Sequence, residues 1–162
     1  MNNLAEHMTN KLETDIREFA RQLYDEQAAF LFKVPEEMTQ TPCDFFGFTR
    51  LGRAVLLEAK MVNRPSLPLG KEPGLRPHQL RALDQAEKSG CVSALIWRRG
   101  DVTVVVPYAD IFVVTGRKSL PWVEPHLDWK VALRALVSRG YVPRNAGSIH
   151  DYEPMAPSKT RS

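Results

Sequence analysis

The fold of this chain follows from residues 43–61, CDFFGFTRLGRAVLLEAKM. Within them, Cys43–Phe48 and Arg53–Met61 are two runs rich in aromatic and aliphatic side chains. A short glycine-containing turn near Leu51 separates the two runs. Two such runs joined by a short turn are typical of a β-hairpin. We therefore expect a hairpin centred on Leu51.

Charged residues interrupt this apolar hairpin at Asp44, Glu58 and Lys60. Alternate side chains of a strand share a face, so Glu58 and Lys60 point the same way. The hairpin places Asp44 across from Glu58, with Cβ atoms about 4.5–5.5 Å apart. Two carboxylates this close repel each other unless a cation lies between them, and Mg²⁺ prefers such oxygen ligands. Lys60 is placed to orient a water near that ion.

A plain alternative is a solvated strand face, because Glu and Lys two positions apart on a strand often mean no more than that. The surrounding residues are apolar, however, and a charge in a buried strand is costly without a partner. The pattern therefore favours a metal site over a solvated face.

The rest of the sequence indicates helices on both sides of a sheet. Strands VSALIW and TVVV are apolar on both faces, as in a central sheet that helices cover on both sides. The segment Asn63–Pro77 holds many prolines and glycines and is expected to be loop. The expected class is α/β, with a central mixed sheet flanked by helices. We expect helices at Asn10–Ala28, Pro77–Ser89, Tyr108–Val113 and Trp129–Ser138, and further strands at Ala29–Val34, Cys91–Trp97 and Val102–Val106.

Length and composition fit one domain. The chain has 162 residues, 43% hydrophobic and 25% charged, with a net charge of +3 that is compatible with binding phosphates. No apolar run approaches the ~20 residues that a membrane span needs, and the polar start does not resemble a signal peptide. A cytoplasmic protein of a bacterial cell is expected, with a phage origin left open. We expect a flexible segment at 1–10, one domain at 11–144 and a mobile tail at 145–162. Cys43 and Cys91 are expected inside strands as free thiols.

The motif residues resemble a known nuclease superfamily. Pro42-x-Asp44 followed by Glu58-Ala59-Lys60 resembles the PD-(D/E)xK signature, and within that superfamily the RecU group of Holliday junction resolvases is the closer match. The resemblance spans about residues 11–144 and depends on the order and spacing of several short motifs. These are Leu12-Glu13-x-Asp15, Asp44-Phe45-Phe46-Gly47, Leu57-Glu58-Ala59-Lys60, Ser66-Leu67-Pro68-Leu69, His78-Gln79 and Gly140-Tyr141-Val142-Pro143-Arg144.

The resemblance implies a restriction-endonuclease-like fold and a metal site. Asp44, Glu58 and the backbone carbonyl of Ala59 would bind Mg²⁺, for which Mn²⁺ can substitute. Glu13 would reach the same ion or a second one from the first helix. For Glu13, favourable electrostatics at a helix start explain the residue equally well.

Two further residues take catalytic roles from the resemblance. Lys60 would position the attacking water and offset negative charge. Gln79 would orient a water or a phosphate oxygen, although an exposed polar residue at a helix start is the plainer interpretation. His78 is expected to pack at the helix start and not to act as a base.

Basic side chains around these motifs are candidates for DNA phosphate contacts, and for any single one a solvated surface position is the simpler expectation. Arg98 and Arg99 are expected in a basic turn. Phe45, Phe46, Trp122 and Trp129 are expected in the core. The candidate DNA-binding residues are Arg50, Arg53, Arg64, Lys71, Arg76 and Arg81.

The function that the resemblance implies is a Mg²⁺-dependent endonuclease, acting as a homodimer that makes paired nicks in four-way DNA junctions. The family has a long insertion, the stalk, between its first two strands, and only about Pro35–Thr41 remains here. Other possibilities stay open. They are a PD-(D/E)xK endonuclease of another specificity (repair, restriction-like or phage DNA processing) and a non-catalytic DNA-binding module of the same fold.

Overall fold

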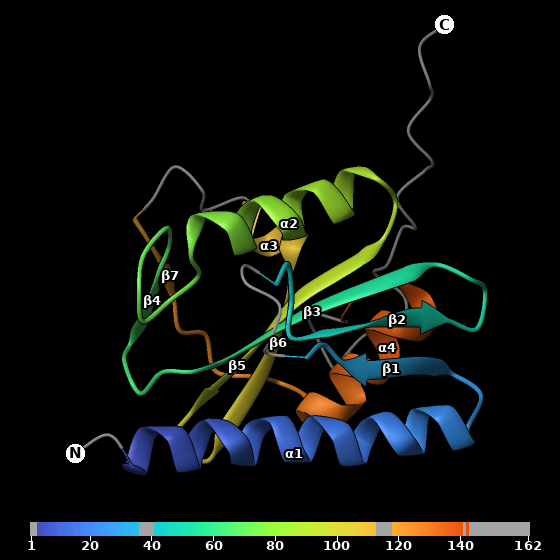
Figure 1. Ribbon diagram of the computed structural model, residues 1–162, viewed down its shortest axis with the longest axis horizontal. Helices are drawn as coiled ribbons and strands as arrows, with labels where there is room; N and C mark the ends of the chain where they lie inside the picture. Colours follow the sequence, from blue (N-terminus) through green and yellow to red (C-terminus); the bar gives the residue numbers. More distant parts are fainter. Residues whose placement is uncertain (1–2, 36–40, 113–117, 141, 143–162) are drawn as a thin grey trace, which may run out of the picture.

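The computed structural model describes residues 3–35, 41–112, 118–140 and 142. A five-stranded sheet and two short extra strands form the framework, with helices on both sides (Figure 1). The expected tail at 145–162 lies outside the described residues. The helices are α1 (Asn3–Asp25), α2 (Pro77–Lys88), α3 (Tyr108–Phe112) and α4 (Trp129–Arg139); the strands are β1 (Ala29–Lys33), β2 (Phe45–Thr49), β3 (Ala54–Met61), β4 (Ser66–Pro68), β5 (Val92–Arg99), β6 (Val102–Pro107) and β7 (Ser119–Pro121).

The main sheet has the order β1-β2-β3-β5-β6 and is mixed. Strands β1, β2 and β3 form an antiparallel meander, β3 runs parallel to β5, and β6 pairs antiparallel with β5. In the hairpin, Phe45 pairs with Leu57 and Phe48 with Ala54, which centres it on residue 51 as predicted. The apolar residues of β3 must face the core, and this requirement fixes the register between β2 and β3.

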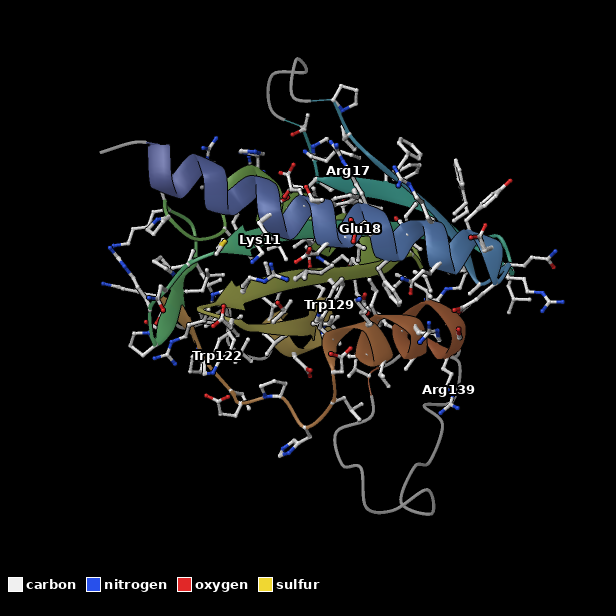
Figure 2. All side chains as sticks on the ribbon, turned by 90° about the horizontal axis from the view of Figure 1, so that it is seen from below. Lys11, Arg17, Glu18, Trp122, Trp129 and Arg139 are labelled. Atoms are coloured by element: carbon white, nitrogen blue, oxygen red, sulfur yellow. The ribbon has the colours of Figure 1, made fainter. Side chains whose placement is uncertain are left out.

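Each face of the sheet carries its own apolar core. On one face, α1 and α4 pack against residues such as Leu57 and Ala59 of β3, and the two helices lie side by side in Figure 2. On the other face, α2 and α3 pack over β5 and neighbouring strands, around Leu83 and Trp97. The expected α/β class, a central mixed sheet flanked by helices, is therefore confirmed.

Two elements differ from the expectations. Helix α1 begins at Asn3 and not at Asn10, so the backbone of residues 3–10 is helical where a flexible segment was expected. The expected loop at 63–77 contains β4, which pairs with β7. Leu67 of β4 and Leu120 of β7 are buried there, because a short two-stranded ladder satisfies the backbone while these side chains join the core.

Several side-chain expectations also need correction. Cys43 and Cys91 lie just before strands, not inside them, although both are free thiols as expected. Arg98 lies in β5 and is buried, because it forms an ion pair with Asp15 (2.7 Å) instead of decorating a turn. Phe46 is only partly buried, and it packs between the exposed rings of Phe32 and Phe48.

The remaining aromatic expectations hold in large part. Phe45 and Trp129 are buried in the core beneath α1 and α4. Trp122 is partly buried and packs edge-on against Trp97, with ring centroids 4.8 Å apart.

Among the described residues, no helix is long and apolar enough to cross a membrane.

Candidate active site

The candidate site forms where the pairing of β2 with β3 ends. Asp44 directly precedes β2, and its backbone N–H donates to the carbonyl of Leu57 (3.0 Å). Its side-chain Oδ2 accepts a hydrogen bond from the backbone N–H of Ala59 (2.8 Å). The N–H and C=O of one residue point to the same side of a strand. The carbonyl of Ala59 therefore faces the same side as the Asp44 carboxylate, beyond the last residue pair of the hairpin.

Glu58 is the most buried acidic group of the site. Its residue is 1% exposed, its Oε1 lies 3.1 Å from Lys60 Nζ, and the same oxygen accepts a hydrogen bond from Gln79 Nε2. Its second oxygen, Oε2, is buried and accepts no hydrogen bond from the described residues, although the protonated carboxyl can donate one to the Asp44 carboxylate. A buried oxygen of this kind is costly in the charged form, so ionised Glu58 needs a further partner such as a cation.

Burial is the main cause that raises the pKa of Glu58 to about 8; the neighbouring Asp44 carboxylate acts in the same direction, and Lys60 acts against it. The two carboxyl groups are therefore close enough to act on one another, as the hairpin register predicted. A cation between the two carboxyl groups would favour their charged forms and lower both pKa values.

Gln79 is held in place by the start of α2. Its Oε1 accepts a hydrogen bond from the backbone N–H of Arg76 (2.9 Å), three residues earlier. Its side chain therefore links the helix N-terminus to Glu58. The plainer alternative, an exposed polar residue, does not hold for Gln79, which is only 8% exposed.

A second group of charges approaches Asp44 from the other face of the sheet. Lys33, the last residue of β1, has its Nζ 3.7 Å from Asp44 Oδ1 and 3.6 Å from Glu13 Oε1. Glu13 comes from α1 and is 9% exposed. Glu13 therefore contacts the candidate site through Lys33.

The residues present fit a hard divalent cation. Within the described ranges, no group of three or more His, Cys, Asp and Glu side chains is arranged to hold a metal ion by itself. Mg²⁺ commonly uses one or two carboxylates and keeps several waters or phosphate oxygens. The buried Oε2 of Glu58, the Asp44 carboxylate and the Ala59 carbonyl supply oxygen ligands of that kind.

Comparisons with known proteins add little to this geometry. No family model matches the sequence, and no curated protein matches it. A solved structure of the Holliday junction resolvase Hjc from Archaeoglobus fulgidus is similar over 62% of this chain and 77% of that chain, with a TM-score of 0.44 and 15% identity.

The structure separates the candidate DNA-binding residues into two groups. Arg50 and Arg53 lie at the turn of the hairpin, about 20 Å along the strands from Asp44. Arg53 is also engaged there, because its Nε donates to the carbonyl of Gly90 (3.0 Å). Arg76 lies at the start of α2 near Gln79, with its side chain paired to Glu72. The second group is exposed and lies between β3 and α2 or in α2 itself: Arg64, Lys71, Arg76 and Arg81.

Lys33 is the site residue that the sequence analysis missed. It ends the strand AFLFK, where a charge interrupts apolar residues just as Glu58 and Lys60 do in β3. The same rule, that a charge in a buried strand needs a partner, would have found it. The pairing with Glu13 and Asp44 depends on α1 and β2 meeting at that point, which no local pattern shows.

Proposed function

We propose that the chain is a divalent-metal-dependent DNA endonuclease of the PD-(D/E)xK type. The observation that carries this proposal is the buried Glu58, whose Oε2 accepts no hydrogen bond from the described residues and whose carboxyl lies beside Asp44 and Lys60. A purely structural acid at this depth would be expected to pair both oxygens. We take residues 11–144 as the nuclease domain.

The proposed ligands of Mg²⁺ or Mn²⁺ are Asp44, Glu58 and the carbonyl of Ala59. A bound ion would act as a Lewis acid toward the scissile phosphate and make an attacking water more acidic. Binding such an ion requires that Glu58 lose its proton, so we expect metal affinity to rise with pH toward the pKa of about 8.

The side chains of the site would position the remaining groups. Lys60 holds its ammonium 3.1 Å from Glu58 Oε1, on the face where a phosphate would approach, and would hold a water or a phosphate oxygen. Gln79 fixes the orientation of the Glu58 carboxyl by donating to it. Lys33 would hold Asp44 in place from the opposite face.

We further propose that the substrate is branched DNA, with the four-way junction as the first candidate and paired nicks as the product. The support for this finer statement is the set of motifs shared with the RecU group, together with a net charge of +3. A homodimer would suit paired nicks, because a four-way junction has approximate twofold symmetry.

The test is cleavage of an end-labelled synthetic four-way junction, with and without Mg²⁺, alongside a linear duplex of the same sequence. We expect Mg²⁺-dependent, symmetric nicks in the junction, and no cleavage by Asp44→Asn although it still binds the junction. Equal rates on junction and duplex would point to a nuclease of another specificity. If the unaltered chain binds the junction without cutting it, the proposed nuclease activity is contradicted.

A further inference from the structure

Two hollows lie along β1, the edge strand of the main sheet (Figure 1). One has a volume of about 420 Å³ and is lined by α1 and most of β1. The other has a volume of about 460 Å³ and is lined by the start of β1, the end of β2 and the hairpin turn. Tyr24, Asp25 and Phe30 line both hollows, which therefore adjoin each other. Together they form one groove along the edge of the sheet, the β1 groove.

Arginine side chains are spread along the β1 groove. Arg17 and Arg21 stand one helical turn apart on α1 and line one hollow, and Arg50 lines the other. All three are exposed, and none of them forms a salt bridge with another described residue. Figure 2 shows Arg17 on the side of α1 toward β1. Among the described residues that line the groove, Asp25 is the one acidic side chain, so the arginines leave the groove positively charged.

Exposed aromatic rings line the same groove. The exposed fraction is 62% for Tyr24, 50% for Phe30 and 42% for Phe32. Ring centroids lie 6.0 Å apart between Tyr24 and Phe30 and 5.9 Å apart between Phe30 and Phe32, with angles of 63° and 42° between the ring planes. The rings are therefore not stacked face to face on one another, and flat ring surface stays available to a partner. Exposed apolar surface of this kind often marks a binding site.

Aromatic rings interleaved with arginines fit a single strand of nucleic acid. Every unpaired base offers a flat face that stacks on an aromatic side chain, and the phosphates pair with arginine. In a duplex, neighbouring base pairs cover these faces, so the rings would find no partner there. A second copy of the chain would bring the same excess of arginine to the groove, and like charges repel. Charge and ring surface together therefore favour the single strand.

The β1 groove ends at the candidate active site. Lys33, the last residue of β1, lines the groove and has its Nζ 3.7 Å from Asp44 Oδ1. The five residues of β1 span about 16 Å, so a strand lying along them reaches from the hairpin turn to Asp44. Arg50 stands at the far end of this path, which gives a DNA contact to a residue that is remote from the candidate active site itself.

We propose that the β1 groove binds a single-stranded segment of nucleic acid and leads it to the candidate active site. Bases stack on Tyr24 and Phe30, and phosphates pair with Arg17, Arg21 and Arg50. The role of the groove in cleavage rests on the proposed function and deepens it, because the substrate then carries an unpaired strand next to its branch. The binding step holds whether or not the chain cuts DNA, so its test uses no cleavage assay.

The first experiment measures, by fluorescence anisotropy without divalent metal, how the full chain binds a labelled oligothymidylate of about 12 nucleotides and a duplex of the same length. Phe30→Ala should lower the affinity for the single strand about tenfold, because one stacked base is lost, and should leave the affinity for the duplex unchanged. Val102→Ala is the matched control, since Val102 is exposed on β6 at the opposite edge of the sheet, and it should bind like the unaltered chain. Unchanged single-strand affinity in Phe30→Ala would overturn the proposal.

The second experiment tests the arginines through the salt dependence of the same binding. Three phosphate contacts on a single strand predict a slope of about −2 for the logarithm of affinity against that of salt, so affinity should fall about 20-fold between about 50 and about 200 mM salt. Arg21→Gln should bring the slope to about −1.4, whereas Phe30→Ala should leave it unchanged. Arg139→Gln, which changes an exposed arginine of α4, is the matched control. An unchanged slope in Arg21→Gln would contradict the phosphate contacts and overturn the proposal.

Sedimentation and the junction assay separate the remaining outcomes. If the unaltered chain sediments at twice the 18.4 kDa of one copy, and Phe30→Ala sediments as one copy with undiminished single-strand affinity, a second copy covers the groove and the proposal is overturned. A chain that cuts the junction yet binds no single strand would overturn the groove and leave the proposed function standing. Single-strand binding that depends on Phe30 and Arg21, in a chain that cuts nothing, would support the groove and contradict the proposed function.

Discussion

Replacing Glu58 by Gln should reveal how much stability the candidate site costs the protein. Glu58 is 1% exposed, and burial together with the charge of Asp44 raises its pKa from 4.5 to about 8. Each pKa unit corresponds to about 1.4 kcal/mol. Ionising this carboxyl therefore costs the folded state about 5 kcal/mol more than it costs the unfolded chain.

The sign of the effect follows from proton binding. Between pH 4.5 and about 8 the folded chain keeps a proton on Glu58 that the unfolded chain has released. Stability from this group is fully present below pH 4.5 and falls as the pH rises through about 8. Gln does not titrate, so only the unaltered chain loses this stability as the pH rises. The free energy of unfolding of Glu58→Gln minus that of the unaltered chain should therefore increase by up to about 5 kcal/mol between about pH 4 and about pH 9.

Guanidinium unfolding followed by tryptophan fluorescence measures this difference at each pH. Glu18→Gln, which changes an exposed glutamate of α1, is the matched control and should follow the unaltered chain. Adding Mg²⁺ at about pH 8 should stabilise the unaltered chain but not Glu58→Gln, because only the carboxylate binds the ion. Parallel pH curves for the unaltered chain and Glu58→Gln would refute the reasoning.

Three further substitutions test neighbouring contacts. Lys33→Met removes the cation shared by Glu13 and Asp44 and should slow junction cleavage about a hundredfold while binding in a gel-shift assay stays nearly unchanged; an unchanged rate would remove Lys33 from the site. Lys60→Met should slow single-turnover cleavage about 10²–10³-fold. It should also move the pH–rate profile to higher pH, since Lys60 lowers the pKa of Glu58. A profile at the same pH would contradict that coupling. Arg98→Met breaks the buried pair with Asp15 and should lower the free energy of unfolding by about 2–3 kcal/mol without changing cleavage per folded molecule; a loss of cleavage in a fully folded variant would show that Arg98 has more than a structural role.

The elements of the sheet could be predicted because their signals are local. The hairpin at 43–61 and the two-sided apolar strands depend on alternation along the chain, and the register of β2 with β3 follows from the turn. The missed elements are β4 and β7, three residues each, whose pairing joins segments about fifty positions apart. Strand pairing over that distance has no local sequence pattern, and the prolines and glycines of 63–77 favoured a loop instead.

The sequence by itself determined that Asp44, Glu58 and Lys60 meet, because all three lie on one hairpin whose register the turn fixes. Only the tertiary structure decided which side chains surround them. Gln79 reaches Glu58 from α2, and Lys33 reaches Asp44 from β1, through contacts between elements that no single segment encodes. Burial, and with it the raised pKa of Glu58, exists only once helices cover both faces of the sheet, since desolvation is a property of the packed molecule.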